Sequence, residues 1–305
     1  MLRALLVAMS RNKTAYKLIM SLPAARRTAM RFVAGEKLAQ AVVVTRELNA
    51  KGITVSLDHL GENVTEAAAT KLATDNYIAA LEAIAENDLK ANISIKLTQL
   101  GLDIDENLCY QNISRVLQRA CDLGGTFVRI DMEGSDYTER TLEMLYRLRE
   151  DGFSNVGTVI QAYLYRSESD LEKLNERRIR VRLCKGAYRE EPKIAFPVKK
   201  NLNDNYVLLA EKLLDQGNYP AIATHDPLMI AAVEKYAQQH KIEPSRFEFQ
   251  MLYGIRRDAQ EELAAQGYNM RVYVPYGIDW YPYFMRRLAE RPANIMFFLT
   301  GLVKG

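Results

Sequence analysis

Two adjacent arginines, Arg286 and Arg287, lie near the C-terminal end of the 305-residue sequence, inside the aromatic segment YPYFMRRLAERP. If this segment is a helix, residues three and four apart are neighbours, and one face carries Tyr283, Arg286, Arg287 and Glu290. Two guanidinium groups at one place can hold a single carboxylate through several charge-assisted hydrogen bonds. The pattern predicts a site for a small carboxylate, with Glu290 orienting one arginine.

Two lysines near the ends of apolar runs indicate a second kind of chemistry. Lys96 lies in NISIKLTQLG, and Lys185 lies in RIRVRLCKGA. A lysine shielded from water can form a Schiff base with a carbonyl substrate. Asp131 is the expected partner of Lys96, and it would hold the ammonium charged and poorly nucleophilic. A Schiff-base enzyme of the aldolase type is therefore the alternative interpretation.

Eight short runs carry these polar residues and have the composition of strands. They are rich in β-branched residues, are closed by Gly, Asp or Pro, and cover residues 53–61, 92–101, 126–134, 156–164, 178–187, 220–227, 246–254 and 270–277. Segments with apolar residues at helical spacing lie between them. Strict alternation of strand and helix predicts parallel strands with helical crossovers, and an α/β fold of the (β/α)8 TIM barrel type is the simplest closure.

In such a barrel the active site lies at the C-terminal ends of the strands. Each predicted strand is polar there, with Asp58 and His59, Lys96 and Gln99, Asp131 and Glu133, Gln161 and Tyr163, Arg182 and Lys185, Thr224, His225 and Asp226, Gln250 and Tyr253, and Tyr273 and Tyr276. One such residue alone more often forms a structural salt bridge. Their convergence on one rim predicts a pocket, with Lys96, Asp131 and Arg182 as a buried cluster of paired charges.

The composition is that of an ordinary globular protein, with 48% hydrophobic and 26% charged residues. The three cysteines fit neither a disulfide framework nor a zinc site. No apolar run approaches the roughly 20 residues of a membrane span, and no GxGxxG follows a strand. A cytoplasmic enzyme without a metal or a Rossmann nucleotide site is expected.

The N-terminal segment differs from the rest in charge. Residues 1–37 contain eight Lys or Arg and one Glu, a local charge of +7 in a chain of net charge +3. Apolar residues are interleaved with these charges, so the segment could lie on an anionic membrane surface or pack as a solvated helix on the main domain. We expect an N-terminal helical extension at 1–51 and a barrel domain at 52–305.

A set of motifs in fixed order resembles the proline dehydrogenase family. The motifs are LGE at 60–62, SIKLTQLG at 94–101, RIDME at 129–133, RLCKGAY at 182–188, ATHD at 223–226 and YxxxRRxxE at 283–290. The resemblance implies a distorted (β/α)8 barrel with a C-terminal helix over its mouth and noncovalently bound FAD. It also implies oxidation of L-proline to 1-pyrroline-5-carboxylate, the first step of proline degradation to glutamate. The hydride would pass to flavin N5, and the electrons to a membrane quinone.

The resemblance also implies a role for each site residue. Lys96, Leu183, Tyr273, Tyr283, Arg286 and Arg287 would bind proline; Asp131 would position Lys96, and Arg182 would lie at the flavin edge as the second catalytic residue. The expected cofactor contacts are Met132, Gln161, Lys185, Gly186, Ala187, Thr224 and His225, together with the acids Glu62 and Glu290, which would pair with the arginines. Arg189 stands where some relatives carry Trp. No general base is assigned.

The DNA-binding and aldehyde dehydrogenase regions of bifunctional relatives have no counterpart in the sequence. A monofunctional enzyme without a nucleic-acid partner is therefore expected. A third interpretation is a noncatalytic amino-acid-binding barrel, which would bind proline without reducing an electron acceptor.

Overall fold

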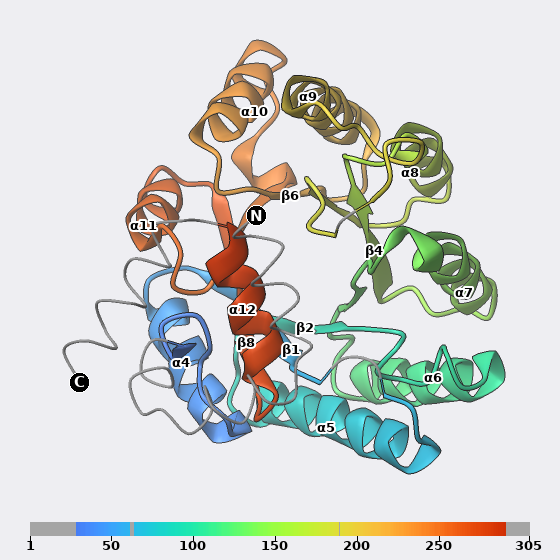
Figure 1. Ribbon diagram of the computed structural model, residues 1–305. Helices are drawn as coiled ribbons and strands as arrows, with labels where there is room; N and C mark the ends of the chain where they lie inside the picture. The colour runs from blue at the N-terminus through green and yellow to red at the C-terminus, as the bar shows by residue number, and fades with distance from the viewer. Residues whose placement is uncertain (1–28, 62–63, 189, 291–305) are drawn as a thin grey trace.

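The computed structural model describes residues 29–61, 64–188 and 190–290, and the eight strands within them form a closed parallel barrel (Figure 1). The strands are β1 (Thr54–His59), β2 (Ala91–Ile95), β3 (Val128–Ile130), β4 (Val156–Gln161), β5 (Val181–Cys184), β6 (Ala221–Ala223), β7 (Glu248–Leu252) and β8 (Asn269–Tyr276). Neighbours in sequence are neighbours in the barrel, and β8 pairs with β1. The predicted (β/α)8 fold is confirmed.

A helix follows each of the first seven strands and packs outside the barrel. These helices are α5 (Ala67–Glu86), α6 (Glu106–Asp122), α7 (Thr138–Glu150), α8 (Ser167–Glu176), α9 (Lys199–Gln216), α10 (Pro227–Gln239) and α11 (Arg257–Ala265). The first turn of α9, from Lys199, lacks the apolar spacing that predicts the rest of the helix. Its first residues are mostly exposed, so they carry no apolar periodicity.

Two further helices complete the barrel in different ways. The helix α4 (Leu38–Ala50) precedes β1, packs against β1 and β8, and lies in the outer ring between α5 and α11 (Figure 1). The helix α12 (Trp280–Glu290) follows β8 but crosses the mouth of the barrel (Figure 1). The predicted boundary at residue 51 stays a prediction. The buried Ala41 of α4 nevertheless belongs to the same core as the barrel strands.

Period-two alternation sends apolar and polar side chains to opposite faces of each strand. Ile93, Val128 and Phe249 are fully buried in the hydrophobic core shared with the helices. Their neighbours in sequence, Ser94 and Arg129, are polar and equally buried. The barrel interior is therefore rich in polar groups that must find partners inside it.

Residues 29–36 hold the start of α12 in place. Phe32 and Val33 are buried in a second apolar cluster with Trp280 and Phe284. The indole N–H of Trp280 donates to Glu36 at 3.3 Å, and the backbone on either side is joined by Ala34 N–H to Pro275 O at 2.9 Å and Gly277 N–H to Gly35 O at 3.0 Å. The orientation of α12 over the mouth thus depends on this segment.

Among the described helices, none is both long and apolar enough to cross a membrane. Residues 1–28, which carry most of the predicted basic segment, lie outside the described residues.

Candidate active site

A cluster of charged side chains lies inside the barrel towards the C-terminal ends of the strands. We call Asp58, Lys96, Asp131, Arg182 and Tyr273 the upper layer. Arg182 Nη1 donates to Asp131 Oδ1 at 2.7 Å, and the Tyr273 hydroxyl donates to Asp131 Oδ2 at 2.7 Å. The guanidinium of Arg182 also lies 5.3 Å from the centre of the Tyr273 ring. Three predicted site residues, which come from β8, β5 and the end of β3, are therefore brought together.

Lys96 lies beside this group and has two carboxylates near its ammonium. Its Nζ is 2.8 Å from Asp58 Oδ1 and 3.9 Å from Asp131 Oδ2, and it donates to the Tyr273 hydroxyl at 3.4 Å. The predicted cluster is present, but the nearer of these two carboxylates is Asp58. Two flanking carboxylates favour the charged ammonium, which disfavours a Schiff base at this lysine.

Burial dominates the electrostatics of the upper layer. It raises the pKa of Asp58 above its ordinary value, and the Lys96 ammonium opposes that shift. It also raises the pKa of Tyr273, an effect that the charge of Asp131 strengthens, so this phenol stays protonated and can donate. Behind Asp58, His59 has its pKa lowered by burial, which favours a neutral imidazole.

Neutral side chains complete the coordination of Arg182. Its Nε donates to Gln250 Oε1, and its Nη2 reaches Ser94 Oγ at 3.2 Å and Ser56 Oγ at 3.4 Å. All three of these partners are buried. Because partners on several strands hold the guanidinium of Arg182, its direction is fixed. A fixed direction suits a cation that must face a bound molecule.

The helix α12 carries the predicted carboxylate clamp over this cluster. Arg287 is buried, Arg286 is partly buried, and the guanidinium of Arg287 lies 5.1 Å from the centre of the buried Tyr283 ring. The negative face of the Tyr283 ring attracts the guanidinium of Arg287 and helps to hold it in place. Glu290 is the last residue of α12, and its side chain lies outside the described residues, as does all of Glu62.

The rim of β4, β5 and β6 holds most of the predicted cofactor contacts. Lys185 Nζ donates to Asp226 Oδ2 at 2.7 Å and to Asn203 Oδ1 at 2.6 Å. Gln161 Nε2 donates to Glu133 O at 2.8 Å. The hydroxyl of Thr224 accepts from Asp226 N–H at 3.0 Å. These polar groups line one side of the barrel mouth.

Another predicted residue of this rim, His225, is held through its ring and its backbone carbonyl. His225 Nε2 accepts from Leu252 N–H at 2.9 Å, and Arg256 donates to its carbonyl at 3.1 Å. An acceptor Nε2 requires the tautomer whose proton is on Nδ1. Met132 is buried beside β3, and Leu183 is fully buried in the core; their proposed contacts with ligands stay predictions, as does that of Ala187.

The loop after β5 is fixed by a close contact and a carboxylate. Gly186 has φ +107°, and a Cβ added there would overlap the Tyr163 ring. The carboxylate of Glu190 accepts from Ser135 N–H at 2.9 Å and from the Tyr163 hydroxyl at 3.2 Å. The loop that carries Lys185 and Gly186 is thus tied to the ends of β3 and β4.

A second group of buried charges lies towards the N-terminal ends of the strands. We call Arg129, Arg180, Glu248 and Arg271 the lower layer. Arg271 Nε lies 2.9 and 3.0 Å from the two oxygens of Glu248. Arg129 Nη1 donates to the carbonyls of Thr158 and Arg180 at 2.9 and 2.8 Å. Gln250 joins the two layers, since it accepts from Arg182 and donates to Glu248.

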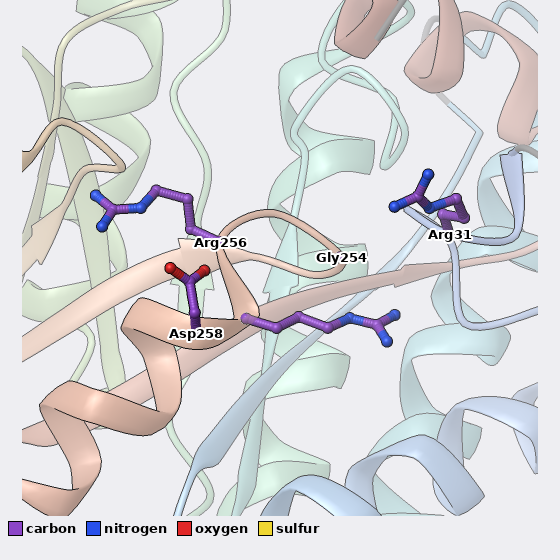
Figure 2. A pocket seen from close by; sticks show the side chains of 5 residues that line it. Arg31, Gly254, Arg256 and Asp258 are labelled. Atoms are coloured by element: carbon purple, nitrogen blue, oxygen red, sulfur yellow. The ribbon is translucent and has the colours of Figure 1, made fainter. Parts of the chain in front are cut away.

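A cavity of about 330 Å³ lies beside the turn that follows β7, and none of the predicted site residues lines it. Its lining residues are Arg31, Gly254, Arg256, Arg257 and Asp258, with three cations and one anion (Figure 2). Gly254 is required there, because a Cβ would overlap the carbonyl oxygen of Arg31. The sequence feature that could have indicated this cavity is the arginine pair at 256–257, but it lies beyond the end of the predicted strand at 246–254.

Sequence reasoning gave no role to Asp58, Gln250 or Glu190, although the first two appear among the residues at the strand ends. Asp58 and Gln250 have the period-two spacing of inward residues, two positions after Ser56 and Glu248 respectively. That spacing could have predicted that they meet the charged cluster. Glu190 lies in a loop, where no periodicity applies.

Comparisons with known proteins show the family to which the chain is similar. The family model described as proline dehydrogenase matches residues 41–298. Proline dehydrogenase 1 of Bacillus subtilis is 43% identical over 304 residues, which cover 100% of both chains. Proline dehydrogenase of Deinococcus radiodurans is 43% identical over 281 residues, which cover 91% of this chain and 90% of the relative.

A solved structure shares the fold. The crystal structure of proline utilization A (PutA) from Bdellovibrio bacteriovorus, inactivated by N-propargylglycine, matches with a TM-score of 0.80 and 28% sequence identity. The match covers 87% of this chain and 32% of that longer chain.

Proposed function

The chain belongs to the proline dehydrogenase family of oxidoreductases, and we propose that it oxidises L-proline to 1-pyrroline-5-carboxylate with noncovalently bound FAD and passes the electrons to a membrane quinone. The observation that carries the proposal is the place of α12. This helix, which contains Arg286 and Arg287, crosses the barrel mouth, and the barrel interior contains the buried cations Lys96 and Arg182.

The cations of the site serve to bind and orient the substrate. Arg286 and Arg287 are the clamp for the proline carboxylate, and Lys96 adds a third positive charge. Tyr273 and Tyr283 supply ring faces for the apolar part of proline. The positive field also disfavours the ammonium form of the ring nitrogen, so the amine loses its proton on binding. No side chain needs to act as a strong base.

The residues on the rim of β4, β5 and β6 fit a flavin nucleotide. Gln161, Thr224 and His225 offer donors and acceptors, and Lys185 offers a cation that is paired with the carboxylate of Asp226. When bound, FAD supplies the hydride acceptor at its N5. The buried guanidinium of Arg182 would favour negative charge at the edge of a ring held above it. Glu62 and Glu290 remain proposed partners of the arginines.

Quinone reduction requires access to a bilayer, and residues 1–37 are the proposed peripheral contact. Their charge of +7 and their interleaved apolar residues support this role. The measurement is sedimentation with anionic liposomes of the full chain and of a variant that lacks residues 1–28. Equal binding of the two proteins would remove the proposal.

The test of function is the visible spectrum of the purified protein in anaerobic buffer, before and after L-proline is added. We expect a flavin absorption that bleaches with proline. The matched control is the double variant Arg286→Met, Arg287→Met, which keeps the flavin band but is not bleached at the same proline concentration. A colourless protein that gains neither a flavin band nor activity with added FAD contradicts the proposal. Borohydride trapping of a keto acid on Lys96 or Lys185 would then favour the aldolase interpretation.

A further inference from the structure

We propose that Asp58 is a positioning residue of the substrate site, whose carboxylate fixes the place and the positive charge of Lys96. The inference rests on the proposed function, because it concerns how the third cation of the carboxylate site is held. The family motifs that indicate the site begin at residue 60 and leave Asp58 unassigned.

The first argument is distance. Lys96 Nζ lies 2.8 Å from Asp58 but 3.9 Å from Asp131, which is beyond hydrogen-bond range. Of these two carboxylates, only Asp58 therefore forms a direct ion pair with a hydrogen bond. Asp131 acts on Lys96 at longer range and through the Tyr273 hydroxyl, which lies 3.4 Å from the ammonium.

The second argument is that Asp131 is already engaged. One of its oxygens accepts from Arg182 and the other from Tyr273, both at 2.7 Å. If Lys96 moved towards Asp131, it would compete with a guanidinium and a phenol for the same two oxygens. Asp131 therefore cannot replace Asp58 as the direct partner of the ammonium without weakening one of these bonds.

The third argument is burial, which separates the two carboxylates by role. The Asp58 side chain is 1% exposed, whereas those of Lys96 and Asp131 are 9% and 11% exposed. Asp58 also pairs in register with Ser94, two residues before Lys96, so its carboxylate lies deeper in the barrel than the ammonium. It acts through Lys96, whose ammonium faces Asp58 on β1, Asp131 after β3 and Tyr273 on β8, with Arg182 of β5 beyond Asp131.

The test compares Asp58→Asn, which removes the charge at nearly constant volume, with Asp58→Glu, which keeps the charge but moves it. The matched control is Asp170→Asn on α8. Asp170 is a buried aspartate with its own cation, since Arg166 Nε lies 2.6 Å from its Oδ2, and it lies on the outer ring of helices. Circular dichroism of each purified protein reports whether it is folded.

The first readout needs no proline. The purified protein is treated at pH 8 with a small amine-acylating reagent, and mass spectrometry gives the labelling of Lys96 relative to the exposed Lys71 of the same sample. In Asp58→Asn we expect the relative labelling of Lys96 to rise by about tenfold or more, because the ammonium loses the carboxylate that favours its charged form. Asp58→Glu and Asp170→Asn should label like the wild type.

The second readout is the split between KM and kcat for proline. In Asp58→Asn, KM should rise by about 10- to 100-fold, the equivalent of one hydrogen bond to a charged group. We expect kcat to change by less than about threefold, because the contact acts on binding in ground state and transition state alike. In Asp58→Glu, KM should also rise, because the charge is displaced. The acylation of Lys96 should stay at the wild-type level.

A folded Asp58→Asn with wild-type KM and wild-type labelling of Lys96 would overturn the inference. If Asp58→Asn does not fold, Asp58→Glu decides, and an unchanged KM in that variant overturns it. Failure of the wild type to oxidise proline would instead contradict the proposed function. The labelling of Lys96 would still test the role of Asp58 in that case.

Discussion

The upper and lower layers of the barrel interior both pair cations with buried carboxylates, yet they differ in what else the cations contact. In the lower layer, Arg129 and Arg271 donate to backbone carbonyls, and Glu248 is held by both of its oxygens. In the upper layer, side chains are paired with side chains, as in the contacts of Asp131 with Arg182 and Tyr273. Backbone partners are fixed by the fold, whereas side-chain partners can exchange with a ligand.

The position along the strands explains the difference in role. The lower layer lies near the N-terminal ends, where loops are short and residues contribute to stability in this class of barrel. The upper layer lies towards the mouth that α12 crosses, and α12 carries the proposed carboxylate clamp. Neither charge nor burial alone therefore identifies a functional residue in this interior. The combination of side-chain partners and access to the mouth does.

The largest expected effect comes from replacing one cation in each layer. Arg182→Met leaves Asp131 without its closest cation and removes a positive charge from the proposed site. We expect the rate of flavin reduction by proline to fall by about 100- to 1000-fold, as for loss of one donor to a developing charge. Arg129→Met removes two hydrogen bonds to buried carbonyls, of which that of Arg180 keeps the N–H of Thr158 as a donor, so the free energy of unfolding falls by about 1–3 kcal/mol.

The measurements that compare the two variants are stopped-flow flavin reduction and urea unfolding. For Arg129→Met we expect a reduction rate within about threefold of the wild type, because its guanidinium donates to the backbone carbonyls of Thr158 and Arg180 and not to a side chain of the upper layer. A rate for Arg129→Met as low as that of Arg182→Met would break the distinction between the layers.

An effect on stability that depends on pH is expected for Glu248→Gln in the lower layer. Burial opposes ionisation of Glu248, but Arg271 outweighs it and holds the pKa of this carboxyl below its ordinary value of 4.5. A carboxyl with a depressed pKa stabilises the folded state above its unfolded pKa, and that contribution is lost as pH falls through the folded pKa. At pH 7 we expect a loss of about 3–5 kcal/mol, since Arg271 stays buried without its partner.

Urea unfolding of the wild type and Glu248→Gln at a series of pH values from 7 downwards is the measurement. The difference between the two free energies should be constant above pH 4.5 and shrink below it. If the difference in the free energy of unfolding persists unchanged below pH 4.5, the cause is poor packing of the substituted glutamine and not loss of the ion pair.

The sequence predicted the strands and the inward residues, because both depend on local pattern. β-branched runs closed by Gly or Asp gave all eight strands, and period-two spacing placed Arg182 and Asp131 in one cluster. The pattern could not choose between Asp58 and Asp131 as the nearer partner of Lys96. That choice depends on the register between strands, in which Asp58 pairs with Ser94, and register is a property of the closed barrel.

Three other features came only from resemblance or from the structure. Helical periodicity placed Arg286 and Arg287 on one face, but it could not show that α12 leaves the ring and crosses the mouth. FAD followed from the family motifs and from no spacing of residues. Tyr163, Gly186 and Glu190 meet through a loop, and loop contacts have no period from which they could be predicted.

The smallest expected effect tests whether burial sets the strength of an ion pair. Lys185 and Asp226 at the rim have side chains 24% and 26% exposed, against 13% and 2% for Arg271 and Glu248. Partial burial opposes ionisation of Asp226, but Lys185 and Leu228 N–H outweigh it, so its pKa lies below 3.8. Asp226→Asn removes the charge and keeps a residue suited to cap α10. At pH 7 we expect a loss below about 1 kcal/mol, since exposed pairs are screened.

Urea unfolding of Asp226→Asn at pH 7 and below pH 3.8 checks this prediction, with Glu248→Gln measured alongside. The depressed pKa means that the contribution of Asp226 is present above its unfolded pKa and disappears as pH falls through the folded one. A loss at pH 7 as large as that of Glu248→Gln would show that solvent does not weaken the rim pair. Contact with solvent could then no longer support the proposal that Lys185 exchanges Asp226 for an anionic ligand, whereas Arg271 keeps Glu248.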